Sequence, residues 1–387
     1  MDAPIMAAQD VLRRAHAEAR DPLAFERIAR DLGPGPFALI ILFLSPETPL
    51  TEAEGRIATA FGTTPVVGCT TAGEIGPEGY SEGGIVAIGL PAAHFAVETL
   101  LVPDLQAIDG QSLIGAAIRA RQRLTRAHPA WDNEFAFLMV DGLSLKEDEL
   151  TGALATGLGP VPLFGGSAGD GVRFRNTYVL HDGRLAENIA TLSLVRTRCP
   201  VRVFSLDHLR PSDRRMVVTE ADPARRLVRQ INAEPAAQEY ARLLGKDPAQ
   251  LTTFTFAAHP LVVRIGGAHH VRAIQRVAPN GDLVFFSAID EGLVLTLAEA
   301  QDMAAHLDAG LAALSRAGTP AAILACDCVL RRIEAEEKQL SGTISGILRR
   351  HQVTGFSTYG EQVGATHVNQ TITGVAIYPP HSPPQGG

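Results

Sequence analysis

Three stretches of the chain share one order of hydrophobic and polar positions. Each begins with an uninterrupted apolar run, at 37–44, 135–140 and 321–326. A short apolar run bounded by turn residues predicts a buried β-strand. A segment of helical character, a Gly-rich turn and a further apolar run follow each of them. Because a pattern that recurs along a chain indicates an internal repeat, we expect three strand, helix, Gly turn, strand units.

The three Gly-rich turns each place a hydroxyl residue a few positions before an acid. Glycine allows positive φ or close backbone approach at a strand end, while a hydroxyl and a carboxylate can cap exposed amides. We favour this structural role over a catalytic one, although the turns could still line a cleft. The pairs are Thr71 and Glu74, Ser167 and Asp170, and Thr358 and Glu361.

Other segments complete a fold of class α/β (α+β), with mixed sheets flanked by helices. Residues 11–19 show helical spacing, and helices are expected at 223–232, 235–244 and 297–314. Asn280 and Gly281 predict a hairpin between strands at 271–277 and 283–289. We therefore divide the 387 residues into an N-terminal helical segment at 1–35, domains at 36–230 and 231–378, and a disordered Pro- and Gly-rich tail at 379–387.

Composition narrows the class of protein. Hydrophobic residues make up 46% of the chain and charged residues 20%, which is typical of a globular protein. The net charge of −8 argues against nucleic acid as a partner. Charged residues near the N-terminus interrupt any signal sequence, and no apolar run is long enough to insert in a membrane, so we expect a cytoplasmic protein.

Motifs typical of enzymes are missing from the sequence. There is no Gly-x-Ser-x-Gly elbow, His-Glu-x-x-His motif or phosphate-binding loop. The scattered cysteines at 69, 199, 326 and 328 are expected to be free, mostly buried thiols. A hydrolase that uses Cys69 or a turn hydroxyl is the least favoured function, because no base accompanies either nucleophile. We expect that the protein is not an enzyme.

The segment 259–272 concentrates imidazoles and guanidiniums on an apolar strand-turn-strand pattern. His259 precedes proline, which favours extended backbone, and Arg264 and Arg272 bracket two further histidines, His269 and His270. Haem would use such a set, with a neutral imidazole on iron and cationic donors for the propionates. A solvated hairpin whose polar groups face water explains the same residues, and both interpretations stay open.

The turns also carry a family resemblance. The sequences VGCTTAGE at 67–74, FGGSAGD at 164–170, GFSTYGE at 355–361 and NQTITG at 369–374 resemble FIST-domain sensory proteins. The resemblance extends over 37–378. It implies a two-domain FIST architecture, with the FIST N-terminal domain at 36–230 and the FIST C-terminal domain at 231–378.

Within that family, HPLVVRIGG at 259–267, VRAIQ at 271–275 and FSAIDEG at 286–292 resemble the free-standing nitric-oxide sensors called NosP. This resemblance implies non-covalent haem b with His259 as the axial iron ligand, and Arg264, Arg272 and His270 around the cofactor. It implies nitric oxide as the signal and a separate histidine kinase, diguanylate cyclase or phosphodiesterase as the partner. A homodimer is an open alternative to a monomer.

A second function stays open beside this one. A FIST sensor without haem would bind an amino acid or similar small ligand between its two domains, through turn amides and Arg264 or Arg272.

Overall fold

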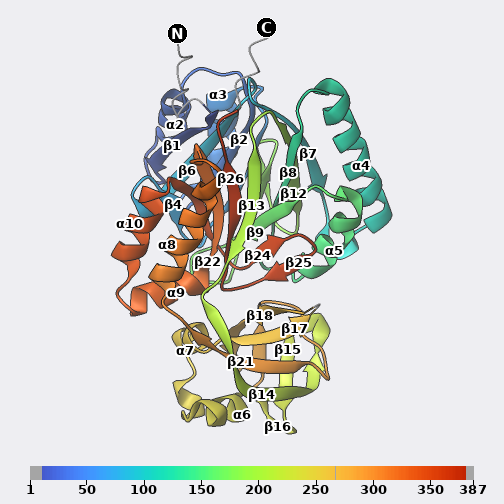
Figure 1. The fold of residues 1–387 in the computed structure, drawn as a ribbon, viewed down its shortest axis with the longest axis vertical. Coiled ribbons are helices and arrows are strands. Elements are labelled where there is room, and N and C mark those ends of the chain that lie inside the picture. The colour runs from blue at the N-terminus through green and yellow to red at the C-terminus, as the bar shows by residue number, and fades with distance from the viewer. Residues whose placement is uncertain (1–10, 266, 381–387) are drawn as a thin grey trace.

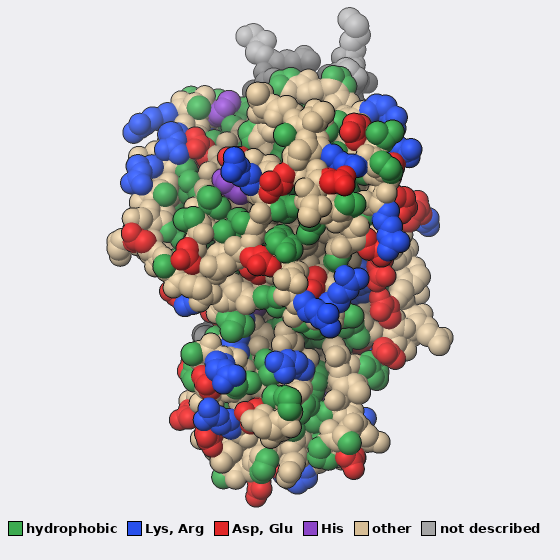
Figure 2. Space-filling model, turned by 180° about the vertical axis from the view of Figure 1, so that it is seen from behind, with side chains coloured by type: hydrophobic (Ala, Val, Ile, Leu, Met, Phe, Trp, Pro, Cys, Tyr) green, Lys and Arg blue, Asp and Glu red, His purple; other side chains and the backbone are tan. Residues whose placement is uncertain are grey.

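A computed structural model describes residues 11–265 and 267–380, and these form a large body and a smaller lobe (Figure 1). The chain leaves the body at 207–208, builds the lobe from 209–300 and returns at 301–302. The waist between the two parts is visible from the opposite side in Figure 2. The first ten residues of the predicted N-terminal segment, and residues 381–387 of the predicted disordered tail, lie outside the described residues.

The body contains three six-stranded sheets of equivalent strand order. The first sheet runs β1 (Arg13–Glu18), β6 (Gly84–Pro91), β2 (Phe37–Leu44), β3 (Val66–Thr70), β10 (Val179–His181) and β11 (Arg184–Ala186). The second runs β7 (Phe95–Val102), β12 (Ala190–Thr197), β8 (Asn133–Val140), β9 (Leu163–Ser167), β24 (Glu361–Val363) and β25 (Thr366–Val368). The third runs β13 (Val201–Leu206), β26 (Ile372–Ile377), β22 (Ala322–Cys328), β23 (Val353–Thr358), β4 (Glu74–Gly76) and β5 (Gly79–Ser81).

The three predicted repeat units are confirmed. In each unit the first strand pairs in parallel with the strand after the helix and antiparallel with the last strand. The parallel pairing requires a crossover, which α3 (Leu50–Phe61), α5 (Glu147–Leu158), or α9 (Val329–Glu337) with α10 (Ser341–Arg350) provides. A second set of helices precedes the central strands: α2 (Ala24–Leu32), α4 (Gly110–Ala127) and α8 (Met303–Leu314).

The units interlock by exchanging hairpins. The hairpin β4–β5 of the first unit extends the sheet of the third, β10–β11 of the second extends the first, and β24–β25 of the third extends the second. Each exchange covers a sheet edge that would otherwise expose unpaired amides and carbonyls. The three units therefore form a closed ring with pseudo-threefold order.

The core lies where the three sheets face one another. Phe43 stacks on Phe356 with ring centroids 4.4 Å apart, and Phe137 stacks on Phe164 at 4.9 Å. These rings come from all three sheets and belong to one buried apolar cluster. The helices cover the outer faces through separate clusters for each unit (Figure 1).

The lobe is an eight-stranded antiparallel structure with its own apolar core. Its helices are α6 (Ala236–Leu244) and α7 (Thr253–Ala258). Its strands are β14 (Leu209–Asp222), β15 (Leu227–Ile231), β16 (Glu234–Pro235), β17 (Leu261–Ile265), β18 (Ala268–Arg272), β19 (Ile274–Val277), β20 (Leu283–Phe285) and β21 (Val294–Ala300). The predicted turn at Asn280 and Gly281 joins β19 to β20, where the Ala278 N–H donates to the Asp282 carbonyl at 2.8 Å.

Three expected helices differ from the structure. Residues 13–18 form strand β1, because Ala15 and Ala17 are buried with period two against β6. The predicted helix at 223–232 is instead a short 3-10 helix (Pro223–Arg225) followed by strand β15. Helix 297–314 divides into the end of β21 and α8, whose N-terminus is capped by Asp302. Among the described residues, no helix has the length and apolar character needed to span a bilayer.

Candidate functional site

The three Gly-rich turns meet at the carboxyl ends of the parallel strands. The Ser357 N–H donates to the Gly73 carbonyl at 2.7 Å, linking the third unit to the first. The Gly169 N–H donates to the Thr70 carbonyl at 2.9 Å, linking the second unit to the first. These bonds gather polar side chains from distant parts of the sequence at one end of the ring, which faces the lobe.

The expected hydroxyl and acid pairs form in the first and third turns. Thr71 Oγ1 donates to Glu74 Oε1 at 2.6 Å, and Thr358 Oγ1 donates to Glu361 Oε1 at 2.5 Å. Glu74 also accepts from the Gly84 N–H at 3.2 Å. The predicted structural role of these turns in capping backbone amides is therefore confirmed.

In the second turn, the hydrogen bonds of Asp170 come from groups other than the hydroxyl of Ser167. Its carboxylate accepts a hydrogen bond from the Tyr359 hydroxyl and from the backbone N–H groups of Phe174, Arg175 and Asn176. The amide bonds range from 2.7 to 3.1 Å. Asp170 thus ties the loop after β9 to the turn of the third unit.

Burial changes the acidity of two of these acids. It raises the pKa of Glu74 to about 7 and that of Glu361 to about 8, against the hydrogen bonds that Thr71 and Thr358 donate to them. Removing a carboxylate from water disfavours its charged form. Both groups therefore hold a proton over part of the neutral pH range.

A cavity of about 210 Å³ lies between the first two turns and α9. Arg332 and Arg173 line it, and the guanidinium of Arg332 donates to the Ser81 carbonyl at 3.0 Å and to carboxylates of Glu82 and Glu336 at 3.1 Å. Glu74 and Glu47 also line the cavity. A guanidinium beside several carboxylates suits a small polar ligand that carries both charges.

The lobe docks on this end of the body through buried polar contacts. Arg226 of the lobe lies 2.7 Å from the carboxylate of Glu147 on α5, and both side chains are buried. Gln370 Nε2 donates to the Ala257 carbonyl on α7 at 2.8 Å. A second cavity, of about 300 Å³, lies beside this interface between Arg226, Phe174 and Phe286.

His259 ends helix α7 next to this interface. Its N–H donates to the Thr255 carbonyl at 3.0 Å, and its carbonyl accepts from the Tyr240 hydroxyl at 2.6 Å. The imidazole is half-buried and forms no hydrogen bond within the described part of the chain. Burial lowers the pKa of His259, and nearby Lys246 and Lys338 lower it further, which favours the neutral ring. His259 lines neither of the two cavities above.

The other sequence-predicted residues lie on the β17–β18 hairpin. Arg272 pairs with Leu261 and His270 with Val263, whereas Arg264 pairs with His269. Because side chains alternate along a strand, Arg272 and His270 share one face and Arg264 lies on the other. Arg264 is exposed. The structure thus brings together two of the three expected propionate donors and separates the third.

Arg272 has an unusual environment for a guanidinium. It is 6% exposed, its Nη1 donates to the Val271 carbonyl at 3.2 Å, and its Nε is buried without a hydrogen-bond partner. Burial lowers its pKa, although Asp148 opposes that shift. A buried N–H without an acceptor is costly, and an acidic ligand group would satisfy it.

The four cysteines are free and buried, as expected. Burial raises the pKa of Cys69 well above its ordinary value, which leaves the thiol protonated and unreactive. The interface residues Arg226 and Glu147 carried no sequence signal, because 79 positions separate them.

Comparison with protein families agrees with the turn motifs. A model described as the FIST N domain matches residues 38–234, and one described as the FIST C domain matches residues 236–364. The resemblance to FIST-domain sensory proteins is confirmed. No curated protein matches the chain.

Proposed function

Because the chain belongs to the FIST family, whose domains sense small ligands and are sensory rather than catalytic, we propose that it senses nitric oxide through haem b held by His259. The observation that carries this proposal is the environment of the His259 imidazole, which is half-buried and without a hydrogen-bond partner in the described chain, and whose burial favours the neutral ring. A histidine that binds iron needs a neutral ring with a free nitrogen lone pair.

The residues around His259 fit this role in part. The Tyr240 hydroxyl fixes the backbone of His259, which limits the positions its ring can take. The buried Nε of Arg272 lacks an acceptor that a propionate would provide, and His270 shares its face of the hairpin. Arg264 points to the other face and is the weakest member of the set. Haem would supply the iron that binds nitric oxide.

The position of His259 suggests how a signal would leave the site. Helix α7 contacts α9 of the body, and the Ala257 carbonyl on α7 accepts from Gln370 of the body. A shift of His259 would move α7 and change the lobe interface, provided the ligand favours one arrangement. The proposed partner that reads this change is a separate histidine kinase, diguanylate cyclase or phosphodiesterase.

Absorption spectroscopy of the haem-reconstituted, reduced protein tests the proposal. We expect a Soret band that shifts when nitric oxide is added. His259→Ala should lose haem affinity or change the Soret position, whereas His306→Ala, which removes an exposed histidine from α8, should leave both unchanged. A His259→Ala protein with normal haem affinity and an unchanged spectrum would contradict the ligand assignment.

A second candidate rests on the cavity beside Arg332. Its guanidinium and carboxylates suit a zwitterion such as an amino acid, as expected for a FIST sensor without haem. Here the protein as purified would be colourless, and amino acids would raise its melting temperature. Arg332→Met should abolish that increase.

A further inference from the structure

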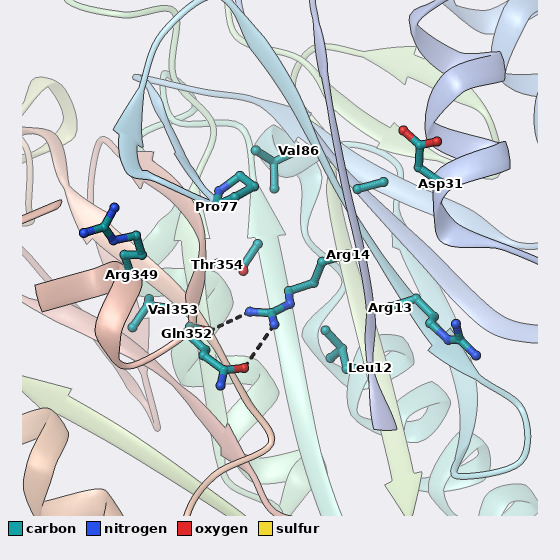
Figure 3. A pocket seen from close by; sticks show the side chains of 11 residues that line it. Leu12, Arg13, Arg14, Asp31, Pro77, Val86, Arg349, Gln352, Val353 and Thr354 are labelled. Atoms are coloured by element: carbon teal, nitrogen blue, oxygen red, sulfur yellow. Dashed lines mark hydrogen bonds between the residues drawn. The ribbon is translucent and has the colours of Figure 1, made fainter. Parts of the chain in front are cut away.

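A third cavity, of about 430 Å³, lies at the seam between the first and third units and shares no lining residue with the two cavities above (Figure 3). Its wall combines β1 and α2 of the first unit with the β4–β5 turn and the segment between α10 and β23. At the other two seams of the ring, β7 contacts β2 and β13 contacts β8. At this seam the β4–β5 hairpin joins the two units, and the cavity beside it has a volume that suffices for a small organic molecule.

Arg14 lines this cavity together with Arg13 and Arg349. Its Nη1 donates to the Gln352 carbonyl at 3.1 Å, and its Nη2 donates to Gln352 Oε1 at 3.1 Å (Figure 3). Both acceptors are neutral. A guanidinium has five N–H groups, so three are left without an acceptor among the residues that the structure describes. Gln352 thereby orients the fork of Arg14 without neutralising it.

The remaining charges of the cavity leave it electropositive. Asp31, its one carboxylate, is bound by Arg30 at 3.0 Å outside the cavity lining. Arg349 contributes another guanidinium, which Glu78 contacts at 3.0 Å. Half-burial of Arg14 separates its charge from water, and an anion would offset that cost.

The rest of the wall is apolar. Leu12, Pro77, Val86 and Val353 line the cavity beside the guanidiniums (Figure 3). A ligand that satisfies both parts needs an oxyanion head for the Arg14 fork and an apolar body for these side chains. We propose that this seam binds a small organic anion, a carboxylate or a phosphate ester, with Arg14 as its principal anchor.

Titration calorimetry on the whole protein tests this site with phenyl phosphate, benzoate, inorganic phosphate and neutral benzyl alcohol. At least one of the two aromatic anions should bind, and the tighter of them identifies the head group. Benzyl alcohol should bind at least tenfold more weakly, since it lacks the charge, and inorganic phosphate more weakly because it lacks the apolar body.

Two variants probe the anchor by different means. Arg14→Met removes the charge, while Gln352→Glu keeps Arg14 and gives it a carboxylate partner. Each should weaken binding of the preferred anion at least tenfold. Arg123→Met, which removes an exposed guanidinium paired with Glu98 on the second unit, should leave binding unchanged. Circular dichroism checks that each variant is folded.

The proposal is overturned if neither aromatic anion binds, if benzyl alcohol binds as tightly as they do, or if Arg14→Met and Gln352→Glu both bind like the original protein. The His259 and Arg332 experiments do not depend on these results, because neither residue lines this cavity.

Discussion

Arg226 of the lobe places a guanidinium nitrogen 2.7 Å from a carboxylate oxygen of Glu147 in the body, and the two side chains are only 4% and 2% exposed. Such a pair contributes little when intact, since desolvation of both ions offsets their attraction. Loss of one partner is different, because it leaves a buried charge uncompensated. The contact between lobe and body is therefore sensitive to single substitutions.

Arg226→Met should lower the free energy of unfolding by about 3–5 kcal/mol. Glu147 would keep its buried charge without its main partner. The double variant Arg226→Met with Glu147→Gln should recover much of that loss. Urea denaturation measures both, with the exposed Arg123→Met as the control. If the double variant were as unstable as the single one, the uncompensated charge would not be the cause.

The buried acids predict a fall in stability with rising pH. Glu74 and Glu361 have pKa values raised to about 7 and about 8 from an ordinary value of 4.5. Between these values the folded protein binds protons that the unfolded chain has released. The stabilising contribution is complete below pH 4.5 and is lost as the pH rises through 7 and 8.

Glu74→Gln should flatten this dependence, because glutamine does not titrate. Between pH 5 and 8 the slope of unfolding free energy against pH should decrease, with a total change of up to about 3 kcal/mol. Chemical denaturation at several pH values gives the slope. Glu52→Gln, at an exposed position of α3, should keep the original slope.

His208, in the segment that connects body and lobe, should make the stability of the protein fall as the pH decreases. His208 lies in the crossing segment, where its Nδ1 accepts from Arg331 at 2.9 Å and its Nε2 lies 3.0 Å from Glu334. Burial lowers the pKa of His208, with a smaller contribution from Arg331. The stabilising effect is present above the ordinary pKa of 6.5 and is lost as the pH falls below it.

His208→Gln should remove that loss. We expect amide exchange in the lobe to accelerate between pH 7 and pH 5 in the original protein, after correction for the intrinsic pH dependence of exchange. The variant should show a smaller acceleration. His306→Gln, on exposed α8 surface, serves as the control. Equal acceleration in all three proteins would exclude His208 as the cause.

Two glycine-to-alanine substitutions should change the stability in opposite directions, one through a steric clash and the other through helix propensity. A Cβ at Gly355 would lie 1.8 Å from the Ala325 carbonyl oxygen of the paired strand, and equivalent clashes occur at Gly68 and Gly165. Gly355→Ala should therefore be strongly destabilising, by about 3 kcal/mol or more. Gly346→Ala in α10 meets open space and should stabilise by up to about 1 kcal/mol. Thermal unfolding of both variants shows whether one melting temperature falls and the other rises.

The sequence by itself determined the features that depend on neighbouring residues. Apolar runs and Gly-rich turns predicted the three repeat units, and the hydroxyl and acid spacing predicted the pairs of the first and third turns but not the different partners of Asp170 in the second. Burial of the cysteines followed from their apolar surroundings. The Ala-rich residues 13–18 fit the period of a helix as well as that of a strand, so the sequence pattern does not distinguish the two. Pairing with strand β6 makes this segment a strand.

Only the tertiary structure decided which distant segments meet. An open strand edge presents the same backbone N–H and C=O groups whatever its sequence, so no local pattern shows which hairpin will pair with it, and the exchange of β4–β5, β10–β11 and β24–β25 was not predicted. The same applies to Arg226 with Glu147 and to Arg14 with Gln352, which are 338 positions apart. Arg264 and Arg272 lie on opposite faces of the β17–β18 hairpin. Side chains alternate between the two faces of a strand, so the face of each residue is known only when the pairing of the two strands is known.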